Sequence, residues 1–545
     1  MHSFKAIRLS QSREVSRLIF IAGVLAGLGY FIYYYANHLT IAHYDAKAHL
    51  LVARRMVDSL TPGYAQLGVN WLPLTHLVYL PFVIFESQYR SGFIPSLLSV
   101  FSFALSGYLV YKISFRITGS ITAGVFAALV LLANPNLQYL QSCPLTEPLY
   151  MAFLLLATHS LICWREDGYA SLPWGAALWT SLGAMCRYEG WYFFAGVLLL
   201  LILDFWMQRE SRRKILQSGG LFLAIVGLPA LAHFGYIYLR LGDNFFHKVV
   251  QGHPAPYMTY RRPLLSLVYH LGELSQVTTI LPLAVAAAGL ILFLAQRQEW
   301  SRRLPLLLLW LPSLINISAL YWGLIYRVRY SVLLLPAVAI FGSLVTTSET
   351  AKRRSILLLS SIVLGLPWLT WLMGHLRPGD ALMPGPGALV LSVVALIVFC
   401  VSRIRQWYSM PLMLLCFLGM HVPPLAREVH PMMAETMEHE FIEPEREKIL
   451  QYLKQNYDGK KILIDMGTEA PLVYDSGLKV KEFIYNEGRE VLWLEATQNP
   501  ERVVGWMCAQ RGDAVWQLMK NDTHWANRYV PVLKTQNYSL LRLKN

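Results

Sequence analysis

Apolar runs of membrane-spanning length dominate the chain from residue 18 to about residue 420. A helix needs about 20 mostly apolar residues to cross the hydrocarbon core of a bilayer. On that spacing we predict a polytopic α-helical membrane protein with about 13 spanning helices. Their approximate ranges are 18–37, 92–111, 118–133, 148–163, 172–186, 191–207, 219–240, 276–295, 304–322, 330–346, 355–374, 387–402 and 408–421.

The segment 38–90, between the first two predicted spans, combines polar stretches with one short apolar stretch. That stretch, PLTHLVYLPFVIF, is interrupted by prolines and is too short to cross a bilayer. A short apolar helix of this kind typically lies in the membrane interface. We therefore predict interfacial helices in this first external loop, within a transmembrane domain over residues 1–423.

The polar and apolar pattern changes after residue 423. EREKILQYLKQNY has the spacing of an amphipathic helix. KILIDM, EVLWLEA and YSLLRLK are predicted as strands, with ERVVGWMCAQ and AVWQLMKN as short elements between turns. We predict a small α/β domain over residues 424–545. It contains no glycine-rich phosphate loop and no convincing catalytic cluster, so we interpret it as a cap or an acceptor-docking module.

Composition and charge agree with a membrane protein. The chain is 55% hydrophobic and 15% charged, with a mean hydropathy of +0.40, whereas soluble domains carry about 25% charged residues. With a cytoplasmic N-terminus, most basic clusters between spans fall on the cytoplasmic side: RESRRK, RQEWSRR, AKRR and SRIR. This explains the net charge of +14 without nucleic acid, and it places the C-terminal domain outside. The six cysteines are scattered and give no disulfide framework or zinc spacing.

Several charged residues on the predicted external side are not explained by topology. The chain leaves the first span and at once enters HYDAKAHLLVARRMVDSLTPGYAQLGVNWLPLTH, residues 43–76. LTEPLY opens the fourth span, CRYEG follows the fifth, and YRVRY precedes the tenth. The candidate site residues in these motifs are Asp45, Lys47, His49, His76, Glu147, Arg187, Glu189, Arg327 and Arg329.

Each candidate also has an ordinary structural interpretation. A glutamate at a helix start, such as Glu147, typically caps the helix or interacts with its dipole. Arginines near span ends extend to lipid headgroups, and His76 suits an interfacial ring. Arg54 and Arg55 with Asp58 form a local surface pair on this view. Considered as a group, however, acids and bases at the membrane are costly, and they indicate a functional site.

The chemistry that such a group fits is sugar transfer from a lipid phosphate. The donor phosphate needs cations, best supplied by planar guanidinium groups. One carboxylate takes the proton of the acceptor hydroxyl as the new bond forms. Cations then stabilise the charge that develops on the departing phosphate. An apolar groove holds the isoprenoid tail of the donor.

The motifs resemble those of GT-C glycosyltransferases. The branch in question contains dolichyl-phosphate-mannose–protein mannosyltransferases, the lipid A aminoarabinose transferase and rhizobial lipopolysaccharide glycosyltransferases. HYDAKAH resembles the acidic motif after the first span, WLPLTH the Pro-rich motif with a histidine, and LTEPLY the acidic-Pro motif of the fourth span. CRYEG and YRVRY resemble the later Arg-bearing span ends. The resemblance covers roughly residues 18–346.

The resemblance implies roles for individual residues. Asp45 is the expected catalytic base, and Glu147 matches the second acidic position, which orients the acceptor or in some relatives helps to bind a metal. His76, Arg187, Arg327 and Arg329 are expected at the donor phosphate or sugar hydroxyls, and Lys47, His49 and Glu189 are included with this donor-binding group. Asp-Ala replaces the Asp-Glu pair of protein mannosyltransferases, which argues against protein mannosylation and against a strict metal requirement. No cofactor is assigned, and the sequence does not decide whether the site binds a divalent metal.

We expect an inverting glycosyltransferase of the bacterial inner membrane, with its active site and C-terminal domain on the periplasmic or extracellular side. Its expected partners are a polyprenyl-phosphate sugar, such as an undecaprenyl-phosphate sugar, a glycan, lipid or protein acceptor, and membrane lipids. A diphosphate-donor oligosaccharide ligase or polymerase is the enzymatic alternative. The non-enzymatic alternatives are a lipid-linked glycan transporter and a non-catalytic membrane assembly factor. The sequence specifies neither the sugar nor the acceptor.

Overall fold

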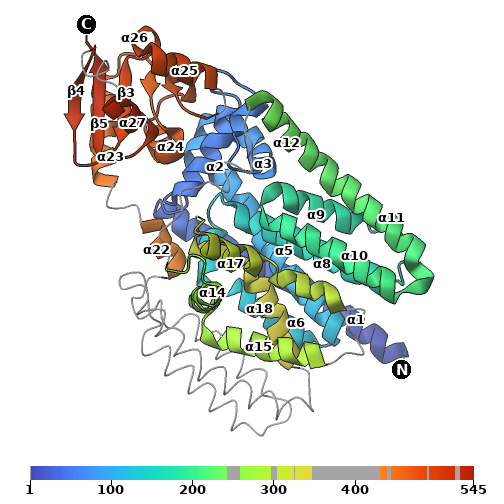
Figure 1. Cartoon of the computed structure of the whole chain (residues 1–545). Helices are drawn as coiled ribbons and strands as arrows, with labels where there is room; N and C mark the ends of the chain where they lie inside the picture. Colours follow the sequence, from blue (N-terminus) through green and yellow to red (C-terminus); the bar gives the residue numbers. More distant parts are fainter. Residues whose placement is uncertain are drawn as a thin grey trace. The chain divides into compact units, whose positions relative to one another are not determined.

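The structure is a computed structural model, drawn in Figure 1. It describes residues 2–241, 258–295, 303–324, 326–346, 430–437, 443–487, 490–521 and 528–544. The chain divides into two compact units. Unit 1 comprises Met1–Asn37, Ser96–Leu231 and Val250–Glu435, and unit 2 comprises His38–Pro95, Ala232–Val249 and Thr436–Asn545. The predicted boundary at residue 423 lies outside the described residues.

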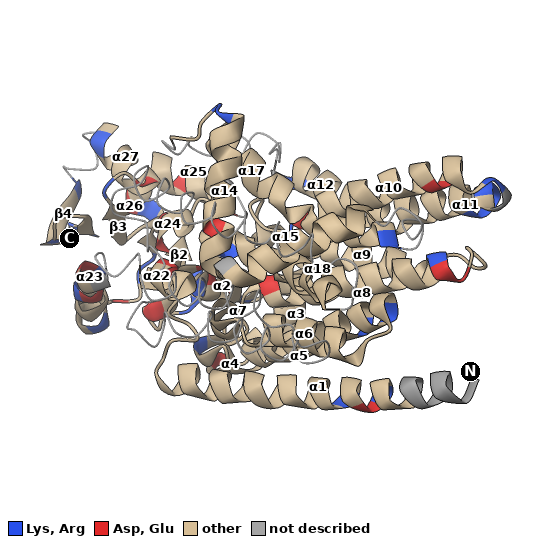
Figure 2. Ribbon diagram, turned by 90° about the horizontal axis from the view of Figure 1, so that it is seen from below, with Lys and Arg blue, Asp and Glu red and all other residues tan. Residues whose placement is uncertain are grey.

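Unit 1 is built from helices. Its elements are α1 (His2–Ala36), α5 (Phe93–Thr118), α6 (Ile121–Leu132), α7 (Pro135–Leu140), α8 (Thr146–Glu166), α9 (Trp174–Cys186), α10 (Glu189–Met207), α11 (Arg212–Phe222), α14 (Pro263–Thr278), α15 (Ile280–Ala295), η5 (Leu304–Trp310), α17 (Pro312–Trp322), η6 (Val328–Leu334), α18 (Leu335–Val345) and α22 (Pro431–Met437). A π-helical turn, Leu223–Gly227, joins α11 to α12 (Leu228–Leu241), which continues into unit 2. In Figure 2, charged residues gather near the ends of α8, α10 and α11.

Within the described ranges, seven helical segments are long and apolar enough to cross a membrane. They are Ser10–Ala36, Phe93–Thr118, Thr146–Glu166, Glu189–Met207, Arg212–Arg240, Leu304–Trp322 and Val328–Val345. The bent pair α14–α15 makes eight if it forms one span. The predicted spans 118–133 and 172–186 are helical but shorter, as α6 and α9. The last three predicted spans lie outside the described residues, so the count of 13 stays a prediction.

The core of unit 1 shows why an apolar sequence forms these elements. Every residue of α18 is buried, as expected for a helix that is apolar on all sides. Its contact with α15 is close at Gly289, where an added Cβ would lie 1.8 Å from the carbonyl oxygen of Phe341. Only glycine allows the two helices to approach this closely.

Unit 2 combines helices of the first loop with the C-terminal domain. The loop helices are α2 (Tyr44–Arg55), η1 (Tyr64–Leu67), α3 (Pro73–Val83) and α4 (Glu86–Ser91). The short helix predicted around PLTHLVYLPFVIF is therefore present as α3. The helices of the C-terminal domain are α23 (Glu443–Asn456), α24 (Met466–Asp475), η7 (Val480–Glu482), α25 (Glu490–Gln498), α26 (Pro500–Val503) and α27 (Ala514–Asn521).

The C-terminal domain contains a five-stranded sheet in the order β2-β1-β3-β5-β4. The strands are β1 (Ile462–Leu463), β2 (Phe483–Ile484), β3 (Trp506–Gln510), β4 (Tyr529–Lys534) and β5 (Tyr538–Leu543). β1 pairs in parallel with β2 and β3, and β5 pairs antiparallel with β3 and β4. The predicted α/β character, the helix α23 and the terminal strand β5 are confirmed.

The predicted strand EVLWLEA is wrong, because these residues form the start of helix α25. Trp493 and Ala496, three residues apart, both pack on the hydrophobic cluster beside the sheet. That spacing places both side chains on one helical face. A short apolar run of this kind fits a strand and a helix equally well, and the packing against the sheet decides between them.

Candidate active site

In unit 1, acids and arginines from five elements form one buried cluster. Glu147 is 1% exposed, and its Oε1 atom lies 2.7 Å from Nη1 of Arg187 and 3.3 Å from Nε of Arg329. Arg187 also binds Glu189 through two nitrogens, at 3.1 and 2.7 Å. Glu435 of α22 lies 3.5 Å from Nε of Arg329 and accepts a hydrogen bond from its backbone N–H. The predicted residues Glu147, Arg187, Glu189 and Arg329 are thus brought together.

The local sequence explains how Glu147 and Arg187 reach this position. Glu147 and Pro148 stand in the first turn of α8, where a carboxylate interacts favourably with the helix dipole. Arg187 ends α9 in an extended conformation, and Glu189 begins α10 two residues later. The turn is tight because Gly190 packs on the backbone of Ala184, where an added Cβ would lie 2.5 Å away. The glycine of CRYEG therefore lets this acid-base pair form between two helices.

Arg329 is the second residue of the apolar segment that begins at Val328. Its side chain is 5% exposed, whereas Arg327, which precedes the helix, is partly exposed. The guanidinium groups of Arg187 and Arg329 lie 5.1 and 5.4 Å from the ring centroid of Tyr330, within the distance of a cation–π interaction. The sequence motif YRVRY thus supplies both an arginine and the ring on which two arginines pack.

Among the described residues, the sequence did not indicate Glu435 or Tyr330 as members of this cluster. Glu435 follows the last predicted span by several residues, and no motif distinguishes it from other acids in the tail. Tyr330 is part of YRVRY, but tyrosines are frequent at membrane interfaces. Only the tertiary contacts of Glu435 with Arg329, and of Tyr330 with the two arginines, reveal their membership.

In unit 2, helix α2 places Asp45 in its first turn. The side chain of His43 caps the helix by accepting a hydrogen bond from the backbone N–H of Asp45, at 3.0 Å. The helix dipole favours a negative charge at this end. Asp45 is partly exposed at the surface of unit 2. A general base must be able to reach the proton that it accepts, and a partly exposed carboxylate meets that condition.

The histidines His49 and His76 form a buried pair next to Trp71. Nδ1 of His49 lies 3.1 Å from Nε2 of His76, and Nδ1 of His76 lies 3.0 Å from the carbonyl oxygen of Leu72. Burial, and after it the neighbouring His49, lower the pKa of His76 well below its usual value. His76 is consequently neutral near pH 7 and offers a hydrogen bond rather than a charge.

The cations of the first loop have carboxylate partners within unit 2. Lys47 lies 2.6 Å from Asp475, and Arg55 lies 2.5 Å from Glu487. Arg54 binds Asp58 at 3.1 Å, so the predicted local pair is present, but its guanidinium is 10% exposed and not on the surface. The sequence gave no reason to select Asp475 or Glu487, because each lies more than 400 residues along the chain from its partner.

The predicted site residues therefore occupy both units. Asp45, Lys47, His49 and His76 belong to unit 2. Glu147, Arg187, Glu189, Arg327 and Arg329 belong to unit 1. Within the ranges that the structure describes, no group of three or more His, Cys, Asp or Glu side chains is arranged to hold a metal ion. In unit 1, the Oε1 atom of Glu147 instead faces two guanidinium groups.

The C-terminal domain also contains a buried acid that the sequence did not single out. Glu469 is 0% exposed and accepts a hydrogen bond of 2.9 Å from the hydroxyl of Tyr538. Burial raises its pKa to about 8, and Arg446, with Nε 3.8 Å away, acts in the opposite direction. Glu469 lies in the interior of the domain, so its carboxyl group is not accessible to a substrate.

No family model and no curated protein sequence matches the chain. The crystal structure of ArnT from Cupriavidus metallidurans bound to undecaprenyl phosphate matches 96% of this chain and 97% of its own, with a TM-score of 0.57 and 15% identity. The chain has the ArnT fold. The apo structure of the same protein matches 95% of this chain and 98% of its own, with a TM-score of 0.52 and 14% identity.

This likeness agrees with the fold class expected from the sequence. The match extends over nearly the whole chain, beyond residues 18–346, on which the motifs were found. With seven described helical segments of spanning length, the chain is an integral membrane protein with a small C-terminal α/β domain.

Proposed function

We propose that this protein is an inverting glycosyltransferase that moves a sugar from a polyprenyl-phosphate donor to an acceptor hydroxyl on the extracytoplasmic side of the membrane. The observation that carries the proposal is the ArnT fold over 96% of the chain, because the ArnT structure in question holds undecaprenyl phosphate. The candidate residues add the side-chain types that this chemistry requires: a presented carboxylate and several arginines.

The proposed reaction is a direct displacement at the anomeric carbon. The oxygen of the acceptor hydroxyl attacks that carbon from the side opposite the phosphate, and the hydroxyl proton passes to Asp45. The bond from the anomeric carbon to the phosphate oxygen breaks with its electron pair, so the phosphodiester becomes a polyprenyl monophosphate. The new glycosidic bond has inverted configuration, and protonated Asp45 later loses its proton to water.

The two acids of the motifs receive different roles on this proposal. Asp45 is the base, because it is partly exposed at a helix N-terminus. Glu147 is a positioning residue, because it is fully buried and its carboxylate holds Arg187 and Arg329. We assign those arginines, with Arg327, to the donor phosphate, and neutral His76 with His49 to the sugar hydroxyls. These assignments are proposals for mutational tests.

The decisive experiment measures sugar transfer by the purified chain in lipid nanodiscs, supplied with radiolabelled undecaprenyl-phosphate sugars and a cell-envelope glycolipid fraction as acceptor. Asp45→Asn keeps the shape of the side chain and removes the base. We expect it to lower kcat by about 10²- to 10⁴-fold, the usual contribution of a positioned general base. The KM for the donor stays close to that of the wild type.

Asp167→Asn is the matched control, because Asp167 is exposed at the end of α8 and the substitution is the same. It should transfer at the wild-type rate. If Asp45→Asn transfers sugar at the wild-type rate, Asp45 is not the catalytic base, and a ligase-type mechanism is favoured. Transfer from a diphosphate donor but from no monophosphate donor would replace the proposal with the ligase or polymerase, and no transfer from either would favour the transporter.

A further inference from the structure

Helix α2 carries the proposed base at its start, and one of its faces is bound by the C-terminal domain. The hydroxyl of Tyr44 donates a hydrogen bond of 2.7 Å to the carbonyl oxygen of Gly467. One turn later, Nζ of Lys47 lies 2.6 Å from Oδ2 of Asp475. At the end of the helix, Nη1 of Arg55 lies 2.5 Å from Oε2 of Glu487. Positions 44, 47 and 55 share a helical face, because eleven residues make about three turns.

The partners of this face come from one continuous region of the C-terminal domain. Gly467 and Asp475 lie near the two ends of α24, which bends at Glu469. Glu487 follows strand β2. Helix α2 is therefore tied at its first turn, at its second turn and at its last residue to α24 and to the chain after β2.

The same region is fastened to the first loop by contacts that do not involve α2. The hydroxyl of Tyr474 donates to the carbonyl oxygens of Tyr89 and Arg90, each at 2.7 Å. Arg90 donates in return to the carbonyl oxygens of Tyr474 and Leu478. These contacts place the residues on either side of Asp475 firmly on the first loop, so Asp475 presents its carboxylate to Lys47 from a fixed position.

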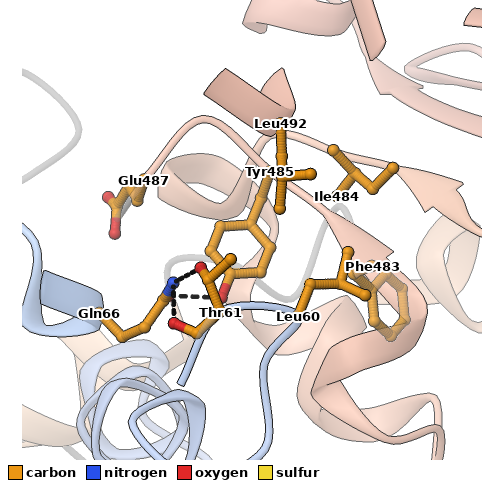
Figure 3. Close-up of a pocket in the computed structure, with 8 residues that line it drawn as sticks. All are labelled: Leu60, Thr61, Gln66, Phe483, Ile484, Tyr485, Glu487 and Leu492. Atoms are coloured by element: carbon orange, nitrogen blue, oxygen red, sulfur yellow. Dashed lines mark hydrogen bonds between the residues drawn. The ribbon is translucent and has the colours of Figure 1, made fainter. Parts of the chain in front are cut away.

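Figure 3 shows a further part of this contact, around a small cavity between the first loop and β2. The hydroxyl of Tyr485 donates to Oε1 of Gln66 at 2.7 Å. The side-chain amide of Gln66 donates to the hydroxyl and to the carbonyl oxygen of Thr61, at 2.8 and 3.1 Å. The polar groups around the cavity are therefore hydrogen-bonded to one another. They form a structural contact between the first loop and the C-terminal domain.

We propose that the C-terminal domain positions the catalytic helix, and that the ion pair Lys47–Asp475 is the contact that fixes Asp45 relative to the acceptor. The proposal rests on the proposed function, because it concerns the placement of the base. It assigns Lys47 a positioning role where the motif alone indicated the donor phosphate, and it makes Asp475 a new positioning residue. The domain is then an integral part of the catalytic unit.

The Lys47–Asp475 pair is largely shielded from water and lies close to the proposed base along α2. The side chains of Lys47 and Asp475 are 11% and 27% exposed, so water screens their attraction only in part. Asp45 stands two residues before Lys47 on the same helix. A general base must lie within hydrogen-bond reach of its proton, and a displacement of about 1 Å can cost about 10²-fold in rate.

The test is a charge exchange across the pair, assayed as kcat and donor KM in nanodiscs. We expect Asp475→Asn and Lys47→Asp each to lower kcat by about 10- to 100-fold, with the donor KM unchanged for Asp475→Asn. The double variant Lys47→Asp with Asp475→Lys restores most of the lost kcat, because the attraction is restored with its direction reversed. A structural or positioning pair allows this rescue, and a lysine that binds the donor phosphate does not.

Asp458→Asn is the matched control within the same domain. Asp458 pairs with Arg542 at 2.8 Å and has no part in the contact with α2, so it should leave kcat and KM at their wild-type values. A normal kcat for Asp475→Asn would overturn the proposal. An unrescued double variant with a raised donor KM in Lys47→Asp would overturn it as well, and would assign Lys47 to the donor.

A second measurement does not depend on transferase activity. Amide hydrogen exchange of the full-length chain in nanodiscs reports how firmly residues 44–55 are held. Asp475→Asn should accelerate exchange in this segment, and the charge-exchanged double variant should slow it again. If amide hydrogen exchange in residues 44–55 is unchanged in Asp475→Asn, the C-terminal domain does not hold α2 through this ion pair. If the wild type transfers no sugar but exchange responds as expected, the proposed function fails and the contact stands.

Discussion

Glu147 lies within ion-pair distance of two guanidinium groups and is 1% exposed. Removing one member of a buried ion pair leaves the other charge without compensation, which costs about 3–5 kcal/mol. We therefore expect Glu147→Gln to lower the free energy of unfolding by about that amount and to lower sugar transfer. Thermal unfolding of the detergent-solubilised protein and the transfer assay measure the two effects.

The matched control for this change lies at the other end of the same helix. Glu166 pairs with Arg116, and the two side chains are 25% and 36% exposed. An exposed pair contributes at most about 1 kcal/mol, so Glu166→Gln should leave the unfolding temperature nearly unchanged. If Glu147→Gln and Glu166→Gln lower the unfolding temperature by the same amount, the buried ion pairs of Glu147 contribute no more to stability than the exposed pair of Glu166.

At the residue scale, motifs in the sequence predicted most members of the unit 1 cluster, but not which side chains pair with one another. Glu147, Arg187 and Arg329 were predicted from motifs at span ends, where charge is otherwise unexpected. Glu435 was not, because an acid in a polar tail carries no such signal. The sequence also placed Lys47 among cations for a phosphate, whereas its carboxylate partner, Asp475, became visible only through tertiary packing.

At the scale of elements, α15 and α18 depend on one glycine. An added Cβ at Gly289 would lie 1.8 Å from the carbonyl oxygen of Phe341. Overpacking of a close contact typically costs about 1–3 kcal/mol. We expect Gly289→Ala to lower the unfolding temperature and the yield of folded protein in detergent, measured by thermal unfolding and by size-exclusion chromatography.

Gly219→Ala is the control for this substitution. Gly219 lies in α11, where an added Cβ meets nothing within 4 Å. Alanine favours a helix over glycine by about 0.5–1 kcal/mol, so this variant should be as stable as the wild type or more stable. A Gly289→Ala variant with the same stability would show that α15 and α18 can move apart without cost.

Sequence patterns predicted element types well where the pattern was long. Within the described ranges the long apolar runs are helices, and YSLLRLK is strand β5. The error at EVLWLEA arose from a run of seven residues, for which periodicity cannot distinguish a strand from a helix. The bend of 117° between α14 and α15 was also not visible in an apolar run, because hydropathy carries no information on direction.

At the scale of the whole molecule, the distribution of basic clusters predicts which parts of the chain face the cytoplasm. Glu447 is exposed in the C-terminal domain, and Arg213 is exposed in the basic cluster RESRRK. We expect a Glu447→Cys variant to react with a membrane-impermeant thiol reagent in spheroplasts. An Arg213→Cys variant should react only after the membrane is permeabilised.

The unsubstituted chain is the control for this labelling, because its own cysteines set the background. Among the described residues, Cys143, Cys186 and Cys508 are buried and Cys163 is partly buried, so the labelling of the unsubstituted chain is measured first and subtracted. The reversed pattern, with Arg213→Cys labelled in spheroplasts and Glu447→Cys protected, would contradict the proposed location of the domain and of Asp45. Labelling of both only after permeabilisation would contradict it as well.

By itself, the sequence predicted a helical membrane protein with an α/β domain after the last span, and its motifs resemble those of GT-C glycosyltransferases. Spanning length, basic clusters and short acidic motifs are local properties, and each can be read along the chain. Tertiary structure decided which charges meet. The partners of Glu147 and Lys47 come from segments far apart in sequence. Which charged side chains form a pair is therefore decided by the packing that brings them within a few ångströms of each other.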